Sequence, residues 1–169
     1  VLGVLGCVDW GKSIKAILPG MDYWVLPVGT GASVAGLSLA ADAKVLAISA
    51  LKNGEALADS IAAWRMQVLG NESDLHKNWS LKTEYCHGGY GKAPPELQAF
   101  IKLFFRHTKI PLDPVYSGKA AWALDKMIQN GQIPKGAKVL FIHTGGVQGI
   151  RGYDGLAEMH HLVPKLQKL

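Results

Sequence analysis

The sequence predicts an α/β fold in which a mostly parallel sheet carries helices on both faces. Apolar runs alternate along the chain with segments of helical periodicity, and this order is typical of parallel strands joined by crossover helices. We interpret four runs as strands, at residues 23–28, 44–50, 81–86 and 138–143. Two of them are nearly continuous in apolar and β-branched residues, as strands buried on both faces of a sheet are.

Three segments between these strands have the apolar spacing of amphipathic helices. Pro94 and Pro95 open the second segment, and Asn130 with Gly131 forms a C-cap for the third. The apolar positions recur every three or four residues, at Leu57, Ile61, Trp64 and Val68, at Leu97, Ile101, Phe104 and Thr108, and at Ala121, Leu124 and Ile128. The sequence has no repeat, low-complexity tract or linker, so residues 1–169 are predicted to form a single α/β domain.

The composition provides enough apolar surface for a core. Hydrophobic residues make up 49% of the 169 residues and charged residues 18%, below the usual level of about 25%. This balance excludes a disordered chain. Glycine is in excess, with 20 residues, and in a chain without a collagen period it points to tight turns and to backbone contacts with a ligand.

The charge pattern argues against a nucleic-acid partner. The net charge of +5 arises from 18 basic and 13 acidic residues that are dispersed along the chain, and the densest basic stretch is residues 165–168. No basic face is interleaved with aromatic residues, as a nucleic-acid groove would be. We therefore expect a solvated surface that tolerates small anions.

Neither a membrane span nor a disulfide framework is predicted. Residues 23–41 carry no charge, but proline, glycine and hydroxyl residues interrupt them, so a strand, a turn and a helix explain them better than a span does. Cys7 and Cys86 are too few for a framework and are interpreted as buried free thiols. Such thiols fit a reducing compartment, and we expect a cytoplasmic protein.

Residues 6–13 match the phosphate loop G-x-x-x-x-G-K-[ST] letter for letter, yet their chemistry favours a helix. Asp9 would repel a polyphosphate, and Val8 and Trp10 are bulky where the loop needs small residues. We interpret the segment as an amphipathic helix and keep nucleotide binding as the weakest alternative. The residues that share one face of this helix are Val4, Val8, Gly11 and Leu18.

Three loops that carry glycine or hydroxyl residues follow predicted strands, at residues 29–33, 87–91 and 144–146. Ligands of parallel sheets bind beyond the carboxyl ends of the strands. In the first loop, backbone amides, a helix dipole and the hydroxyls of Thr30 and Ser33 would converge on one phosphate. It does not match the dinucleotide fingerprint, because Val34 stands at the third glycine position. The alternative is that the glycines of this turn serve close packing alone and bind no phosphate.

The histidines do not have the spacing of a metal site. His143 ends an apolar strand and is interpreted as a hydrogen-bonded core residue. His160 and His161 are interpreted as part of a solvated helix end. The sequence therefore predicts no metal ligand.

Four segments, in this order, resemble the pyridoxal-phosphate enzymes of the D-cysteine desulfhydrase and 1-aminocyclopropane-1-carboxylate deaminase family. This family has the tryptophan-synthase-β type of fold, also called fold type II, and the resemblance runs over nearly the whole chain. The segments are Pro-Val-Gly-Thr-Gly at residues 27–31, Gly-Gly-Tyr-Gly at 88–91, Leu-Asp-Pro-Val-Tyr-Ser-Gly-Lys at 112–119 and Ile-His-Thr-Gly-Gly at 142–146.

The resemblance implies pyridoxal 5'-phosphate as cofactor, a small amino acid as substrate and a homodimer. It places Tyr116 beside the pyridine ring and Tyr90 facing the substrate, and these are the candidate catalytic residues. Thr144, with Ser117, would meet the pyridine nitrogen, where a neutral hydroxyl tunes the electron sink. The residues that would hold the cofactor phosphate are Gly29, Thr30, Gly31, Ala32 and Ser33.

Two departures from the family pattern shape the expected function. Deaminases of the family carry Glu at the position of Ser117, whereas desulfhydrase-type members carry Thr, so the resemblance favours β-elimination to a keto acid and ammonia. The family's Schiff-base lysine segment and its Ser-Asn-His loop have no match here. The resemblance therefore implies the C-terminal portion of the cofactor-binding large domain, inactive alone. Lys12, Lys15, Lys44 and Lys119 are not assigned that role. A non-catalytic phosphate- or cofactor-binding module is the alternative.

Overall fold

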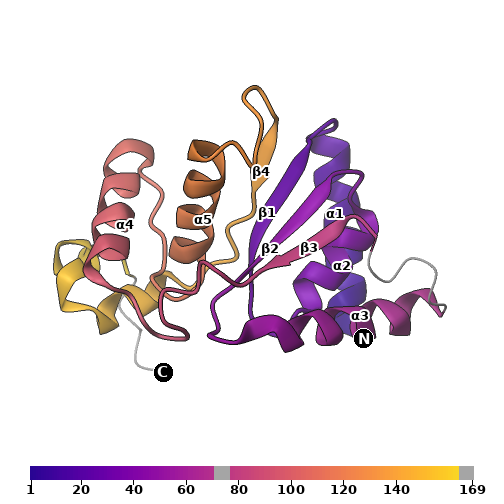
Figure 1. Ribbon diagram of the computed structural model, residues 1–169, viewed down its shortest axis with the longest axis horizontal. Coiled ribbons are helices and arrows are strands. Elements are labelled where there is room, and N and C mark those ends of the chain that lie inside the picture. The colour runs from indigo at the N-terminus through magenta and orange to yellow at the C-terminus, as the bar shows by residue number, and fades with distance from the viewer. Residues whose placement is uncertain (71–76, 164–169) are drawn as a thin grey trace.

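Four parallel strands form the sheet at the centre of the fold within residues 1–70 and 77–163, the part of the chain that the computed structural model describes (Figure 1). They are β1 (Tyr23–Val28), β2 (Lys44–Ser49), β3 (Trp79–Lys82) and β4 (Val139–Phe141), in the order β3-β2-β1-β4. Every strand pair is parallel, with Val25 of β1 opposite Leu46 of β2 and Phe141 of β4. This is the parallel sheet that the sequence predicts.

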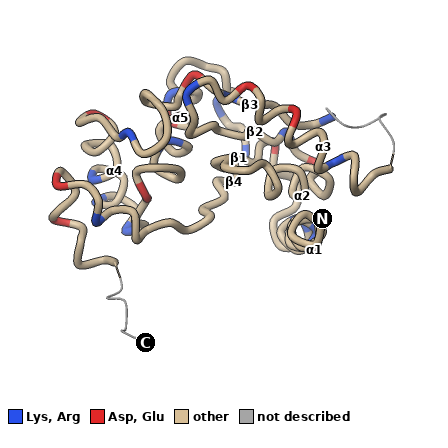
Figure 2. Tube along the Cα trace, turned by 90° about the horizontal axis from the view of Figure 1, so that it is seen from below, with Lys and Arg blue, Asp and Glu red and all other residues tan. Residues whose placement is uncertain are grey.

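Helices cover both faces of the sheet, as predicted. Figure 2 shows α1 and α2 on one side of the strands and α5 on the other. The helices are α1 (Leu2–Ile17), α2 (Ala32–Ala40), α3 (Leu57–Leu69), α4 (Pro95–Thr108) and α5 (Ser117–Gln129), with 3₁₀ helices at Gly54–Ala56, Val147–Gly152 and Asp154–Leu162. The basic stretch at residues 165–168 lies outside the described residues.

Side chains of β1 alternate between two cores, because successive residues of a strand point to opposite faces. Trp24 and Leu26 are fully buried against α1, α2 and α3, whereas Val25 packs against Ala120 and Ala123 of α5. Neighbouring β2 alternates in the same way. A strand with apolar partners on both faces must itself be continuously apolar, which explains why residues 23–28 could be delimited from the sequence.

The segment that matches the phosphate loop is helical throughout, as its amphipathic pattern predicts. Residues 6–13 lie inside α1, so their amides are committed to helical bonds and cannot wrap a phosphate. Gly11 is buried, and a Cβ on it would lie 2.7 Å from Cβ of Ala40, which explains the glycine as a close approach of α1 to α2. The predicted face is wrong at Leu18, which is the C-cap and is 42% exposed.

The sequence-predicted bounds differ most from the structure at β3, which the apolar pattern places at residues 81–86. The side-chain amide of Asn78 donates to the carbonyl oxygens of Ser38 and Ala41, both at 3.0 Å. This contact sets the start of the strand at Trp79, and pairing with β2 ends at Lys82. Tertiary contacts of one side chain thus override the local apolar pattern. Strands β2 and β4 end one and two residues earlier than predicted, at Ser49 and Phe141.

Helix ends follow the predicted capping residues. Pro94 caps α4 and Pro95 occupies its first turn, while Asn130 caps α5 and Gly131 has φ 76°. Cys7 and Cys86 are free and half-buried rather than buried. Within the described ranges, no helix combines the length and the apolar character needed to cross a bilayer.

Candidate functional site

A pocket of about 340 Å³ opens beyond the carboxyl ends of β1 and β4, where the sequence places the candidate site. Its size falls in the range of pockets for small molecules and cofactors. Three chain segments supply the lining: the end of β1 with the loop into α2, Tyr116 immediately before α5, and the loop after β4. The residues are Pro27, Val28, Gly29, Thr30, Gly31, Ser33, Val34, Tyr116, Thr144, Gly145 and Gly146.

The β1–α2 loop aims the N-terminal end of α2 at the pocket. Gly31 is the N-cap of α2 with φ 90°, a conformation that glycine adopts without strain. It must also be small, because a Cβ there would lie 2.8 Å from Cγ1 of Ile61 in α3. The first amides of a helix have no acceptor within that helix. These amides, together with the hydroxyls of Thr30 and Ser33, therefore present donors to the pocket.

Tyr116 covers the loop from the opposite side. A Cβ on Gly29 would lie 3.6 Å from Cε1 of Tyr116 and 3.7 Å from its hydroxyl, so the tyrosine ring rests over the glycine. Burial raises the pKa of the Tyr116 phenol above its ordinary value, and the neighbouring phenol of Tyr90 raises it further. The phenol is therefore protonated at neutral pH and can donate a hydrogen bond into the pocket.

The third side of the pocket is the glycine turn after β4, which His143 holds in place. The ring contacts the carbonyl oxygen of Pro111 through Nε2 at 2.8 Å, and its Nδ1 accepts the amide N–H of Gly145 at 3.0 Å. These two bonds require Nε2 to carry the ring proton. His143 is thus hydrogen-bonded, as the sequence predicts, but it is half-buried rather than part of the core. It connects the Thr144 turn to the segment that leads into Tyr116.

Asp113 fixes the backbone on which Tyr116 stands. Its carboxylate is 2% exposed and accepts the amides of Val115, Tyr116 and Ser117 at 2.9, 2.7 and 2.8 Å. The Ser117 hydroxyl donates to the same carboxylate at 2.5 Å and accepts the amide of Asp113 at 2.8 Å. A Cβ on Gly146 would lie 3.0 Å from Cγ of Asp113, so the glycine turn packs directly on this carboxylate.

The structure brings most, but not all, of the sequence-predicted site residues to the pocket. Ser117 and Ala32 lie outside its described lining. Ser117 is fully buried, with its hydroxyl engaged by Asp113 rather than facing the pocket. Tyr90 also lies outside the lining, is 63% exposed, and faces Tyr116 with ring centroids 6.0 Å apart and an interplanar angle of 66°.

Two charged residues near the site, Asp113 and Lys119, received no role from the sequence. Both stand in the quoted segment Asp-Pro-Val-Tyr-Ser-Gly-Lys, which was the available signal. Lys119 is 1% exposed, and its ammonium group donates to carbonyl oxygens of the loops after β2 and β3. Burial lowers the pKa of Lys119 below its ordinary value.

Lysines 12, 15 and 44, which the sequence left without a catalytic role, lie on the surface away from the pocket. Lys12 pairs with Asp9 at 3.1 Å, and Lys15 pairs with Asp42 at 3.3 Å. Lys44 is exposed at the N-terminal end of β2, opposite to the end where the pocket opens. The described lining of the pocket includes no lysine.

The residues present fit a phosphorylated, flat ligand. Every lining residue that the structure describes is uncharged, so a phosphate would be held by amides, hydroxyls and the positive end of the α2 dipole. The face of Tyr116 provides a flat apolar wall, and Thr144 stands across the pocket with a hydroxyl that can donate or accept. Over residues 1–70 and 77–163, no group of three or more histidine, cysteine or acidic residues is arranged to hold a metal ion.

Comparisons with known proteins point to one family. The family described as "Pyridoxal-phosphate dependent enzyme" matches residues 2–145. The chain is 29% identical to a 1-aminocyclopropane-1-carboxylate deaminase of Bradyrhizobium sp. (strain BTAi1), covering 90% of this chain and 49% of that protein. It is 33% identical to the mitochondrial bifunctional D-cysteine desulfhydrase/1-aminocyclopropane-1-carboxylate deaminase of Arabidopsis thaliana, covering 96% of this chain and 42% of that protein.

Solved structures give the same result for the fold. A crystal structure of an ACC deaminase homologue superposes with a TM-score of 0.77 at 30% identity, covering 92% of this chain and 50% of that one. Threonine deaminase isoform 2 from Solanum lycopersicum superposes with a TM-score of 0.58 at 14% identity, which shows a shared fold alone. The chain therefore has the fold of these pyridoxal-phosphate enzymes, and it spans about half the length of the curated relatives it matches.

Proposed function

Because the chain belongs to the family of pyridoxal-phosphate-dependent enzymes, we propose that its pocket binds pyridoxal 5'-phosphate for a lyase or deaminase reaction on a small amino acid. One observation carries this proposal: a glycine loop at the N-terminus of α2 faces Tyr116 and Thr144 across a single pocket. The bound cofactor supplies an electron sink that stabilises negative charge at the α-carbon of the substrate.

In this proposal each wall of the pocket has one task. The amides of residues 29–33 and the hydroxyls of Thr30 and Ser33 bind the phosphate. The ring of Tyr116 would lie beside the pyridine ring, and the neutral hydroxyl of Thr144 would meet the pyridine nitrogen. Ser117 lies behind Tyr116 and acts through Asp113, which anchors the backbone of both residues.

The proposed reaction is β-elimination, of the D-cysteine desulfhydrase type. With one water molecule consumed, it releases the β-leaving group, ammonia and a keto acid. Tyr116 stays protonated at neutral pH and stands at the mouth of the pocket beside Tyr90, so the two phenols can donate hydrogen bonds to the substrate. The name of the Arabidopsis relative includes both this activity and the deaminase activity.

Removal of the α-proton in this family needs a lysine, and the described lining supplies none. We therefore propose that the chain corresponds to the C-terminal portion of the cofactor-binding domain and that the lysine comes from a polypeptide segment outside these residues. The same observation favours a second candidate function, a module that binds the phosphorylated cofactor without catalysis.

The test is calorimetric titration of the purified chain with pyridoxal 5'-phosphate, with pyridoxal and with inorganic phosphate. We expect the first to bind most tightly, pyridoxal to bind at least about tenfold more weakly, and phosphate to compete with the cofactor. Equal binding of pyridoxal and its phosphate would refute the assignment of the α2 loop. Pyruvate formation from D-cysteine separates the two candidate functions once a lysine-bearing partner segment is added.

We also propose a homodimer, as the family resemblance implies, and a cytoplasmic location, which the free thiols of Cys7 and Cys86 favour. Sedimentation equilibrium of the purified chain tests the first part, and fractionation of the source cells tests the second. A monomer at all concentrations, or recovery in another compartment, would contradict the respective part.

A further inference from the structure

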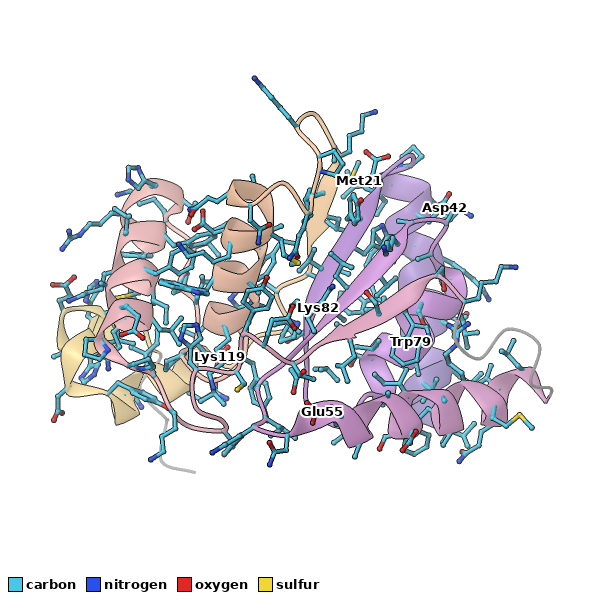
Figure 3. The ribbon with its side chains drawn as sticks, viewed as in Figure 1. Met21, Asp42, Glu55, Trp79, Lys82 and Lys119 are labelled. Atoms are coloured by element: carbon cyan, nitrogen blue, oxygen red, sulfur yellow. The ribbon has the colours of Figure 1, made fainter. Side chains whose placement is uncertain are left out.

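Lys119 is a buried cation at the start of α5, on the side that faces the connection between β3 and α4 (Figure 3). Its ammonium group donates to the carbonyl oxygens of Gly89 at 2.6 Å, Cys86 at 2.8 Å and Ala50 at 3.4 Å. An ammonium group has three protons, so these acceptors use its whole donor capacity. Lys119 thereby connects α5 to the loops that follow β2 and β3.

Two of these acceptors also close turns within the β3–α4 connection. The carbonyl oxygen of Cys86 accepts the amide of Gly89 at 3.0 Å, and that of Gly89 accepts the amide of Lys92 at 3.1 Å. Lys119 therefore binds both turns at the atoms that define their shape. Both contacts precede Tyr90 in the chain, and the second holds the turn from Gly89 to Lys92 in which Tyr90 stands.

A second anchor holds the same loop from another part of the chain. The hydroxyl of Tyr153 donates to the carbonyl oxygen of Gly91 at 2.7 Å. Tyr153 lies between the 3₁₀ helices Val147–Gly152 and Asp154–Leu162, so this bond comes from the chain beyond the Thr144 turn. Residues 86–91 are thus fastened on one side by α5 and on the other by the C-terminal 3₁₀ helices.

The loop needs such anchors because its backbone is irregular. Positive φ angles occur at His87 (50°), Gly88 (88°), Gly89 (113°) and Gly91 (67°). A segment of this kind has neither a helical nor a strand ladder to fix it. Tyr90 is 63% exposed, so burial of its own side chain does little to hold it opposite Tyr116.

We propose that Lys119 and Tyr153 are positioning residues that shape residues 86–91 so that Tyr90 faces Tyr116 at the mouth of the pocket. The role of Tyr90 and Tyr116 toward a substrate rests on the proposed function. The compact ammonium group of Lys119 reaches three carbonyls that point at one spot, a geometry that the planar fork of arginine does not match.

The test is NMR of the full chain, without cofactor, with carbon-13 in the tyrosine rings. The wild type is expected to show a cross-peak between the rings of Tyr90 and Tyr116, assigned with the Tyr90→Phe and Tyr116→Phe variants. Lys119→Met should lose this cross-peak, and the amides of Gly89 and Lys92 should exchange with solvent at least about tenfold faster. Lys126→Met, the same change farther along α5, is the matched control and should retain both signals.

Tyr153→Phe removes a single hydroxyl and serves as the second variant. It tests the positioning role if Lys119→Met does not fold. It should weaken the cross-peak and speed exchange at Lys92. An unchanged cross-peak in the folded Lys119→Met protein, or in Tyr153→Phe when that is the folded variant, overturns the inference.

The two proposals fail separately in these experiments. A chain that binds no pyridoxal 5'-phosphate, yet loses the cross-peak in Lys119→Met, contradicts the proposed function and supports the positioning role. A chain that binds the cofactor and retains the cross-peak in that variant supports the proposed function and contradicts the positioning role.

Discussion

The hydroxyl of Ser117 and the carboxylate of Asp113 form a closed pair, in which the hydroxyl donates to the carboxylate at 2.5 Å and accepts the Asp113 amide at 2.8 Å. The same carboxylate accepts three backbone amides. Because Asp113 is 2% exposed, it depends on these donors to offset the loss of water. The pair therefore sets the entry of the chain into α5 and the position of Tyr116.

Asp113→Asn should destabilise the protein by about 2–3 kcal/mol, because the amide replaces an acceptor by a donor in front of buried N–H groups. Urea unfolding measures the change. Asp125→Asn, at a half-buried position of α5 where the carboxylate accepts a hydrogen bond from the Gln129 side chain, is the control and should change the free energy of unfolding by less than about 1 kcal/mol. Equal effects of the two substitutions would show that Asp113 is not the anchor.

Gly29→Ala should reduce the affinity for pyridoxal 5'-phosphate at least about tenfold while leaving the free energy of unfolding within about 1 kcal/mol. Its Cβ would meet the Tyr116 ring at ordinary contact distance, 3.6 Å, and would narrow the pocket. Gly152→Ala, where a Cβ meets nothing within 4 Å, is the matched control and should leave affinity unchanged. Full affinity in Gly29→Ala would contradict a cofactor site at this loop.

Gly31→Ala should cost more stability than Gly20→Ala, although both glycines have positive φ, 90° and 72°. The shared backbone strain costs about 1–2 kcal/mol. At Gly31 the added methyl would also lie 2.8 Å from Cγ1 of Ile61, whereas at Gly20 it meets nothing within 4 Å. The overlap should add about 1–3 kcal/mol. Thermal or urea unfolding of both variants gives the difference, and equal losses would contradict the close approach.

The stability difference between the wild type and Lys119→Met should depend on pH. Burial lowers the pKa of Lys119 from its ordinary value of 10.5, so between the folded and the unfolded pKa the unfolded chain binds more protons. The free energy of unfolding of the wild type should therefore rise, relative to the variant, as the pH rises through this window toward 10.5. Urea unfolding at several alkaline pH values measures the slope. If the stability difference between the two proteins shrinks as the pH rises, the pKa of Lys119 is not lowered in the folded protein.

The sequence allows β1 to be delimited at both ends, because its residues are apolar toward both cores and Asp22 and Gly29 bound the run. It does not delimit β3, whose start depends on Asn78 and two carbonyl oxygens of the α2–β2 region. Local patterns describe burial, whereas strand ends depend on the neighbouring strand and on individual tertiary contacts.

The glycine loop could be predicted because its residue types reveal its chemistry, and Tyr116 because the resemblance to the family places it beside the pyridine ring. Asp113 and Lys119 could not, since their partners are backbone amides and carbonyls. Every residue has such groups, so the sequence does not show which of them a buried charge will meet. Ser117, which the resemblance places near the pyridine nitrogen, is fully buried with its hydroxyl on Asp113. Its proximity to Tyr116 along the chain does not reveal that α5 turns it inward.

The uncharged lining of the pocket has a consequence for selectivity. Backbone amides and aliphatic hydroxyls do not titrate in the physiological range. The attraction of the loop for an anion therefore does not change with the protonation state of the loop. A lysine or arginine cradle would attract any polyanion from a distance, whereas a dipole at a helix end acts only within about one turn. The pocket should therefore discriminate among phosphate esters by the shape of the attached group, and added salt should weaken its binding little.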